Sequence, residues 1–202
     1  MKDKDHSTGG NQPQRKAAKL HFRYSSVNAG KSTQLLQIAY NYTEMGKKVV
    51  LFTAAVDDRT AVGQIASRLG AQREAMTFDS QTNFCDVMGD QSQIDCLLVD
   101  ESQFLSIKQV KQLHRIAAVG GVPVMCFGLR TDFQGEPFTG STYLLALAED
   151  IQEIRAICSC GRKSTMNMRL DEAGQRVSAG PQILIGGNDR YRQLCARCFY
   201  VA

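Results

Sequence analysis

A strand that runs into a small-residue loop and then into Gly-Lys-Ser-Thr constrains this chain more than any other stretch. Apolar and aromatic residues alternate through Leu20, Phe22 and Tyr24, as in a strand, and Gly30-Lys31-Ser32-Thr33 opens a helical pattern. In loops of this kind backbone N–H groups surround phosphate oxygens, a lysine reaches the terminal phosphates and a hydroxyl holds Mg²⁺. The alternative is an ordinary helix start capped by Ser32 or Thr33. We favour a phosphate-binding loop.

The match to such a loop is imperfect at its first position, where Ser25 replaces the usual glycine. The stretch Gly30-Lys31-Ser32 keeps the part at which the backbone approaches phosphate and the cation and metal ligand sit. The predicted site for ATP and Mg²⁺ therefore spans the whole loop: Ser25, Ser26, Val27, Asn28, Ala29, Gly30, Lys31, Ser32 and Thr33.

The segments after the loop predict a strand-helix-strand unit. Apolar residues over 35–45 fall on one helical face, Gly46 supplies a stop, and residues 47–53 form a β-branched run. Further along, residues 108–119 and 141–148 have helical patterns, and residues 122–127 and 151–157 read as strands. Residues 60–93 have no pattern that assigns them in detail.

A second strand ends in two carboxylates. Residues 94–99 are mostly apolar, and Asp100-Glu101 follows where a buried parallel strand would open onto the phosphate site. We expect Asp100 to hold Mg²⁺, directly or through water, beside Ser32. Glu101 points elsewhere by strand alternation and is free to take a proton. The alternative is an acidic turn that caps the next helix.

Two further loops follow predicted strand ends, where parallel sheets present ligand sites. Asp57-Asp58-Arg59 is either a solvated turn or a place where Arg59 meets developing phosphate charge, and we favour the second. Residues 128–138 carry polar, cationic and aromatic groups. There Phe133 either stacks on a planar base or, with Phe138, fills the core beneath the loop.

Size and charge exclude several classes of protein. A chain of 202 residues suits one domain with a small appendage, and its net charge of +4 comes partly from the tail, which argues against nucleic acid as the main partner. Residues 1–18 are polar and aperiodic and are expected to be disordered. No apolar run reaches membrane-spanning length and residues 1–19 lack the core of a signal peptide, so we expect a cytoplasmic protein without a membrane partner.

Four of the seven cysteines form two close pairs. Cys158 and Cys160 are followed after 34 residues by Cys195 and Cys198, which together offer the four soft ligands that tetrahedral Zn²⁺ prefers. The alternative is two pairs of free thiols. The single residue within the first pair departs from the usual spacing of two to four residues. The remaining cysteines, Cys85, Cys96 and Cys126, lie in apolar surroundings and are expected in the core.

An apolar run that closes on two glycines lies between the cysteine pairs, over residues 182–191. Tied at its base by metal, it would be a loop whose backbone can read the edges of a ligand. A simple hairpin of the metal module is an equally good interpretation.

From Leu20 to Tyr200 the chain resembles the type II, zinc-containing thymidine kinases. The resemblance rests on several motifs that occur in this order. They are Ser-x-x-Asn-Ala-Gly-Lys-Ser-Thr at 25–33, Asp57-Asp58-Arg59, Val-Asp-Glu-Ser-Gln-Phe at 99–104, Gly-Leu-Arg-Thr-Asp-Phe at 128–133, the two cysteine pairs, and Ile-Gly-Gly-Asn-Asp-Arg-Tyr at 185–191. Each motif is weak to moderate by itself, and together they are strong.

The resemblance implies an α/β fold with a RecA-like domain and a mostly parallel sheet (residues 19–157), followed by a small zinc-binding lasso domain (residues 158–202). It implies an ATP:thymidine 5′-phosphotransferase that uses Mg²⁺ with ATP and a structural Zn²⁺ and forms a homotetramer. Use of deoxyuridine as a second substrate and feedback by dTTP are left open by the sequence. Glu101 would take the proton of the 5′-hydroxyl and Arg59 would steady the transferred phosphate. The remaining implied residues are Asp57, Asp58, Asp100, Ser102 and Gln103 for ATP and Mg²⁺; Leu129, Phe133, Gln182, Ile183, Leu184, Ile185, Gly186 and Tyr191 for thymidine; and Cys158, Cys160, Cys195 and Cys198 for zinc.

Two other classes remain as alternatives. A nucleic-acid-stimulated ATPase would need a second motor domain or partner subunits and a basic groove, neither of which is evident in the sequence. A zinc interaction module with a vestigial nucleotide site is disfavoured because Lys31, Ser32, Asp100 and Glu101 are all present.

Overall fold

The computed structural model describes residues 15–56, 63–89, 93–182 and 190–201. Its centre is a six-stranded sheet in the order β5-β2-β6-β7-β1-β8, with every neighbouring pair parallel. The strands are β1 (Leu20–Ser25), β2 (Val49–Ala54), β5 (Met76–Phe78), β6 (Cys96–Val99), β7 (Val124–Leu129) and β8 (Asp150–Glu153). The predicted α/β class with a mostly parallel sheet is confirmed.

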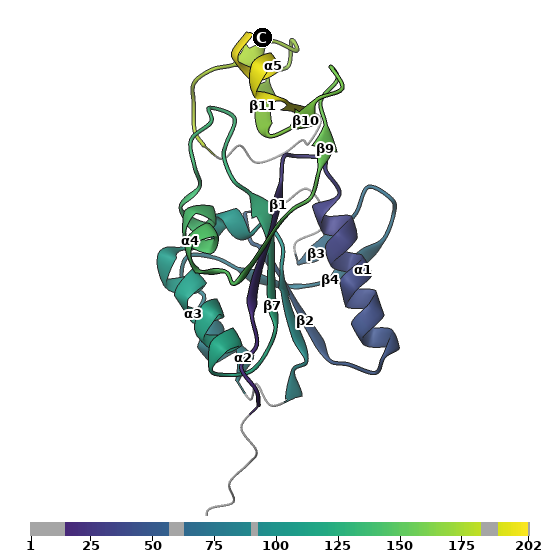
Figure 1. Cartoon of the computed structure of the whole chain (residues 1–202), viewed down its shortest axis with the longest axis vertical. Helices are drawn as coiled ribbons and strands as arrows, with labels where there is room; N and C mark the ends of the chain where they lie inside the picture. Colours follow the sequence, from purple (N-terminus) through teal and green to yellow (C-terminus); the bar gives the residue numbers. More distant parts are fainter. Residues whose placement is uncertain (1–14, 57–62, 90–92, 183–189, 202) are drawn as a thin grey trace, which may run out of the picture.

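Helices cover both faces of this sheet (Figure 1). Helix α1 (Lys31–Glu44) packs on one face, and α2 (Phe84–Met88), α3 (Ile107–Ala118) and α4 (Thr139–Leu147) pack on the other. Helix α3 begins with a capping box, in which the Ser106 hydroxyl accepts from the Gln109 backbone N–H and the Gln109 side chain accepts from the Ser106 backbone N–H. This cap places the helix start just before the residue at which the apolar periodicity predicts it.

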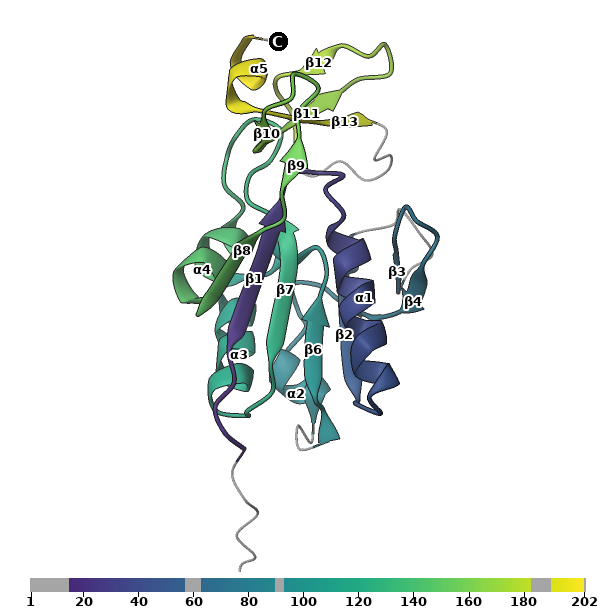
Figure 2. The ribbon, with the colours of Figure 1, turned by 45° about the vertical axis from the view of Figure 1, so that its right-hand side comes forward.

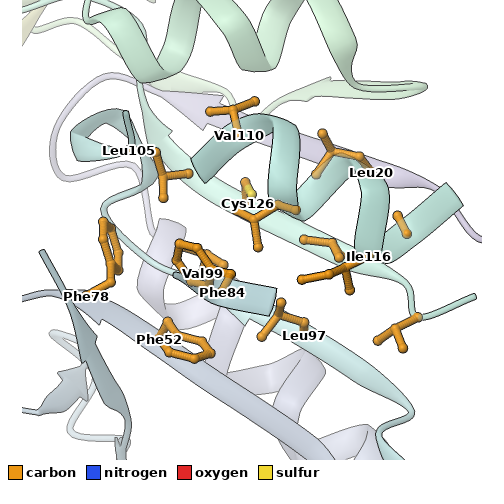
Figure 3. Packing of buried hydrophobic residues seen from close by; sticks show 14 of the residues in the cluster. Leu20, Phe52, Phe78, Phe84, Leu97, Val99, Leu105, Val110, Ile116 and Cys126 are labelled. Carbon is orange, nitrogen blue, oxygen red and sulfur yellow. The ribbon is translucent and has the colours of Figure 1, made fainter. Parts of the chain in front are cut away.

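The core on the α2–α4 face is aromatic and aliphatic, as Figure 3 shows. Phe84 packs edge-on against Phe52, with ring centroids 5.0 Å apart. Cys96 and Cys126 are fully buried and Cys85 is half-buried. Burial raises the pKa of the Cys96 thiol to about 12, so this thiol stays protonated and packs as a small hydrophobe, as the sequence predicts.

A second, smaller assembly lies over the carboxyl ends of the parallel strands (Figure 2). It contains the β9–β10 pair, the antiparallel sheet β12-β11-β13 and the short helix α5. The bounds are β9 (Ala156–Ile157), β10 (Lys163–Ser164), β11 (Met166–Leu170), β12 (Arg176–Val177), β13 (Tyr191–Leu194) and α5 (Ala196–Val201). We call this assembly the cysteine module, because two of the four paired cysteines, Cys158 and Cys195, belong to its own buried cluster. The domain boundaries at 18/19 and 157/158 remain predictions.

Three segments differ from the sequence prediction or add to it. The single strand predicted over 151–157 is wrong: β8 ends at Glu153, and β9 instead pairs antiparallel with β10 because the chain leaves the sheet to enter the cysteine module. Residues 15–18, the end of the predicted tail, lie against the domain, where the Ala18 N–H donates to the Ala117 carbonyl. The unassigned region contains β5, α2 and a hairpin of β3 (Gln64–Ala66) and β4 (Gln72–Glu74).

No helix within the described ranges is both long enough and apolar enough to cross a bilayer.

Candidate active site and metal centre

The loop between β1 and α1 has the backbone of a phosphate-binding loop. Asn28 and Gly30 both have positive φ angles, 61° and 87°, the left-handed backbone conformation from which anion-binding loops are built. Gly30 is the residue just before α1, so the start of that helix adds its own N–H groups. The φ of Gly30 lies in the left-handed region, which disfavours residues with a Cβ. Space is not the reason for glycine here, because an added Cβ would meet nothing within 4 Å.

The departure at Ser25 has a structural role. Lys31 is 7% exposed, and its ammonium donates to the Ser25 hydroxyl and to the Ser26 carbonyl, each at 3.2 Å. A buried ammonium requires such oxygen partners. Glycine at position 25 would lack the hydroxyl, so serine adds one oxygen to the set that holds the lysine inside its loop.

Ser32 and Asp100 meet across the site, although they are far apart in the sequence. The Ser32 hydroxyl, at the start of α1, donates to Asp100 Oδ2 at 2.8 Å. Asp100 directly follows β6 and is 2% exposed. A hydroxyl and a carboxylate so close are the pair of ligands that hold Mg²⁺ in phosphate-loop enzymes. The structure therefore brings together the two residues predicted to be metal ligands.

Glu101 lies beside this pair in a constrained conformation. Its φ is 50°, in the left-handed region that residues with a Cβ seldom adopt, and its backbone N–H donates to Asp100 Oδ1 at 3.0 Å. Its carboxylate accepts from Gln103 Nε2 at 2.5 Å, while Gln103 Oε1 accepts from the Leu129 N–H at 3.1 Å. Gln103 thus links Glu101 to the end of β7 and fixes the direction of its carboxylate.

Ser102 and Gln103 lie behind the site, in the short 3-10 helix η2 (Ser102–Phe104). Ser102 is fully buried and Gln103 is 3% exposed. Gly128 of β7 lies directly against them, since a Cβ there would come within 2.7 Å of Ser102 Oγ and 2.8 Å of Gln103 Oε1. These two residues contact the strand beneath the site, and their predicted contact with ATP or Mg²⁺ remains a prediction.

A cavity of about 800 Å³ opens beside the loop. Its walls include the loop from Val27 to Thr33, the carboxylates Asp100 and Glu101, and Leu129. The β3–β4 hairpin, which the sequence left unassigned, closes the cavity with residues that include Ser67 and Arg68. A volume of this size can hold a nucleotide-sized ligand.

The loop after β7 connects the sheet to the cysteine module. Phe133 is 2% exposed, and the Arg169 guanidinium of β11 lies over its ring, 3.6 Å from the centroid. Gln182 Nε2 donates to Asp132 Oδ2 at 3.1 Å, and Arg169 Nη1 donates to the Pro181 carbonyl at 2.8 Å. The stem of the predicted lasso is thus held to this loop. Phe133 is buried as core filling would require, and its stacking on a base stays a prediction.

Several predicted site residues lie outside the described residues. They are Asp57, Asp58 and Arg59 after β2, and Ile183, Leu184, Ile185 and Gly186 of the lasso. Tyr191, on the return side of the lasso, begins β13, and its carbonyl accepts from Asn28 Nδ2 at 3.5 Å. The return strand of the lasso therefore reaches the tip of the phosphate loop.

The four predicted metal ligands come together within the cysteine module. The Sγ atoms of Cys158, Cys160, Cys195 and Cys198 all lie within 4.8 Å of one another, and those of Cys160 and Cys195 are 3.6 Å apart. Four thiolates at zinc–sulfur distances of about 2.3 Å in a tetrahedron would stand about 3.8 Å apart. The cluster can therefore hold a metal ion of this kind.

Electrostatics in the cluster also suit ligation. Backbone N–H groups of Cys160 and Cys195 lower the pKa of the Cys158 thiol to about 6, which favours the thiolate that binds metal. Hydrogen bonds of the Cys198 thiol to its neighbours, with Cys160 first, raise its pKa to about 12. Metal binding at Cys198 must therefore release a proton. A turn that ends at Gly161 brings Cys158 and Cys160 together despite the single residue between them. Gly161 has a φ of 83°, and its N–H donates to the Cys158 carbonyl at 2.8 Å.

Comparison with known proteins decides the family. A family model described as thymidine kinase matches residues 18–199. The chain belongs to the thymidine kinase family. It is 57% identical over 183 residues to a thymidine kinase from Chromobacterium violaceum, covering 91% of this chain and 98% of that protein. It is 55% identical to one from Albidiferax ferrireducens, covering 91% and 93%, and 51% identical to one from Idiomarina loihiensis, covering 89% and 95%.

Among solved structures, a Pif1 helicase from Candida albicans has a TM-score of 0.43 and 17% identity to this thymidine kinase family member. The match covers 68% of this chain and 36% of the helicase. So distant a likeness carries no argument about function.

Sequence reasoning missed residues of the candidate site that link separate segments. Asn167 and Arg169 of β11 are buried against the phosphate loop and the loop after β7, and Asp132 organises the latter loop. No sequence signal marks Asn167, because its burial shows only in the folded chain, where such an amide must find hydrogen-bond partners. The turn sequence Asp132-Phe133-Gln134-Gly135 was the one signal in the sequence that could have been used.

Proposed function

We propose that this protein transfers the γ-phosphate of ATP to the 5′-hydroxyl of thymidine. Membership of the thymidine kinase family supports the reaction. The observation that carries the proposal is the approach of the Ser32 hydroxyl to Asp100 Oδ2 at 2.8 Å, with Glu101 next to it, in one cavity with the phosphate loop. A phosphate donor site and a proton acceptor are thereby adjacent, as phosphoryl transfer requires.

The donor half of the proposed site consists of the loop and the first turn of α1. Backbone N–H groups of the loop would bind phosphate oxygens, and the Lys31 ammonium, held by the Ser26 carbonyl, would reach the β- and γ-phosphates. Ser32 and Asp100 would hold Mg²⁺, which neutralises charge on the phosphates when it is bound. Arg59 would add a cation near the transferred group. Preorganised charge of this kind is the largest contribution to catalysis of phosphoryl transfer.

The acceptor half begins at Glu101. Its carboxylate, oriented by Gln103, would accept the proton of the 5′-hydroxyl as that oxygen attacks phosphorus, which contributes about 10²–10⁴ in rate. Leu129 would lie near the thymine methyl, with Phe133 and Tyr191 at base and sugar. Residues 182–186 would contact the pyrimidine largely through their backbone. Deoxyuridine lacks only that methyl, so it should also be accepted.

Zinc is the metal we assign to the four-cysteine cluster. Cys158, Cys160, Cys195 and Cys198 would act as a Cys₄ structural site, and the module gains stability from it because its own apolar cluster is small. The proposal also includes a homotetramer and feedback by dTTP, both of which rest on the family resemblance, and a cytoplasmic location.

One experiment tests the reaction. The purified chain is incubated with Mg²⁺, [γ-³²P]ATP and each of thymidine, deoxyuridine, deoxycytidine, deoxyadenosine and deoxyguanosine, and labelled monophosphates are separated. Labelled dTMP as the main product is expected, with dUMP second. Hydrolysis of ATP that appears only when DNA or RNA is added would reject the kinase, and no turnover with any substrate would favour a zinc interaction module.

A further inference from the structure

One peptide unit of the phosphate loop is held from both sides. The carbonyl of the unit between Ser26 and Val27 accepts from Lys31 Nζ at 3.2 Å, and the N–H of the same unit donates to Asn167 Oδ1 at 2.8 Å. A peptide unit is planar, so the direction of its N–H fixes the direction of its carbonyl. The partner of the N–H therefore orients the oxygen that holds Lys31.

That partner comes from the cysteine module. Asn167 lies in β11, opposite Gln193 of β13, and is 2% exposed. Its other amide atom, Nδ2, donates to the Thr131 carbonyl at 2.8 Å. An N–H can only donate and a carbonyl can only accept, so a neutral amide, which carries both an acceptor and donors, matches the two sites together.

The Thr131 end of this link is rigid without Asn167. Asp132 Oδ1 accepts from the N–H groups of Gln134 and Glu136 at 2.8 and 2.9 Å, and the Asp132 N–H donates to the Glu136 carbonyl at 2.9 Å. Thr131 also forms a β-bridge with Pro137. The loop after β7 thus serves as the fixed anchor, and Asn167 transmits its position to the phosphate loop.

We propose that Asn167 is a positioning residue for phosphoryl transfer, which orients the Ser26–Val27 peptide and through it the Lys31 ammonium. The inference rests on the proposed function, because it gives Lys31 a phosphate to bind. Asn167 acts through the loop backbone and does not touch ATP. Ser164 of β10 is a second, weaker tie, since its hydroxyl lies 3.1 Å from that of Ser26.

The test compares Asn167→Leu with Gln193→Met. Leucine keeps the approximate size of asparagine and removes both hydrogen bonds. Gln193 faces Asn167 across the same strand pair but donates to the Ile157 carbonyl, within the cysteine module and away from the phosphate loop. The matched control thus removes one amide from the same small sheet. Calorimetric binding of Mg·ADP without nucleoside, steady-state KM and kcat, melting temperature and zinc content are measured for each variant.

The expected result is specific to the phosphate side. In Asn167→Leu the Kd for Mg·ADP and the KM for ATP rise about tenfold, the loss typical of one buried hydrogen bond, and kcat falls. The KM for thymidine stays within about twofold of wild type, because the loop after β7 has its own bonds. Gln193→Met binds Mg·ADP as the wild type does. If Asn167→Leu fails to fold, Asn167→Ala removes the same two hydrogen bonds without the bulk of leucine, and the same weakening of Mg·ADP binding is expected.

Unchanged Mg·ADP affinity in a folded Asn167 variant would overturn the inference, as would an equal loss in Gln193→Met. Because the binding measurement needs neither thymidine nor turnover, it separates this inference from the proposed function. A wild-type chain that binds Mg·ADP but does not phosphorylate thymidine would reject the kinase and leave the Asn167 result to be judged by binding alone.

Discussion

A single added methyl group at Gly128 should disable the site while leaving the fold intact. Gly128 lies near the end of β7, where a Cβ would stand 2.7 Å from Ser102 Oγ, 2.8 Å from Gln103 Oε1 and 3.0 Å from Gln103 N. The Gln103 oxygen must retreat by about 0.6 Å to restore ordinary contact at 3.4 Å. That movement pulls on the amide that donates to Glu101 and accepts from Leu129.

The size of the effect follows from these contacts. Overpacking of this kind costs about 1–3 kcal/mol of folding stability, which for a chain of this length lowers the melting temperature by about 2–12 °C. Displacement of a catalytic group by a fraction of an ångström to 1 Å lowers kcat by about 10²-fold. Gly128→Ala should therefore show a kcat about 100 times lower.

Gly46→Ala is the matched control. Gly46 has a φ of 69°, and a Cβ there would meet nothing within 4 Å, so the variant has backbone strain without a clash and lies at the far end of α1. It should lose about 1 kcal/mol of stability and keep its kcat. Steady-state kinetics and thermal melts of the two variants separate stability from activity. A Gly128→Ala enzyme with near-normal kcat would refute the positioning role given to Gln103.

Two further predictions concern the metal and acid stability. Cys160→Ser should lose most of the bound zinc and melt at a lower temperature than the wild type. Cys85→Ser, whose cysteine lies outside the cluster, should keep one zinc per chain when both variants are compared by elemental analysis. Equal zinc content in the two variants would contradict the Cys₄ site. Burial raises the pKa of the Glu149 carboxyl, but hydrogen bonds from the Leu20 N–H and from His114 outweigh it and lower that pKa below its usual value. Ionised Glu149 therefore stabilises the fold above pH about 4.5. This stabilisation is lost as the pH falls through the lower pKa of the folded state. Glu149→Gln should then cost less than about 1 kcal/mol at pH 7, because solvent screens the pair, and progressively less as the pH falls below about 4.5, as chemical unfolding over a pH series would show.

The main elements of the fold could be predicted because their signals are local. The strand over Leu20 to Tyr24, the helix after Lys31 and the apolar run before Asp100 each carry their own periodicity or composition. Met76–Phe78 could not be assigned, because three residues carry no period and their strand forms only by pairing with β2. The β8–β9 break was missed for a similar reason, since only the cysteine module offers β9 its partner.

The site divides in the same way. Residues whose type and place at a strand end define their chemistry, such as Ser32, Asp100 and the four cysteines, could be named in advance, and the structure brings each set together. Asn167 could not, because its role depends on a contact with Val27, 140 residues away. Sequence patterns identify residue types at element ends, but only tertiary packing shows which element supports which loop.

Glu101→Gln tests the central claim most directly. Glutamine keeps the size and hydrogen-bonding reach of glutamate but cannot accept the proton of the 5′-hydroxyl. Thymidine phosphorylation and Mg·ADP binding are measured side by side with the wild type. We predict that kcat falls at least about 100-fold while the Kd for Mg·ADP stays within about threefold. Near-normal turnover of thymidine by Glu101→Gln would contradict the account.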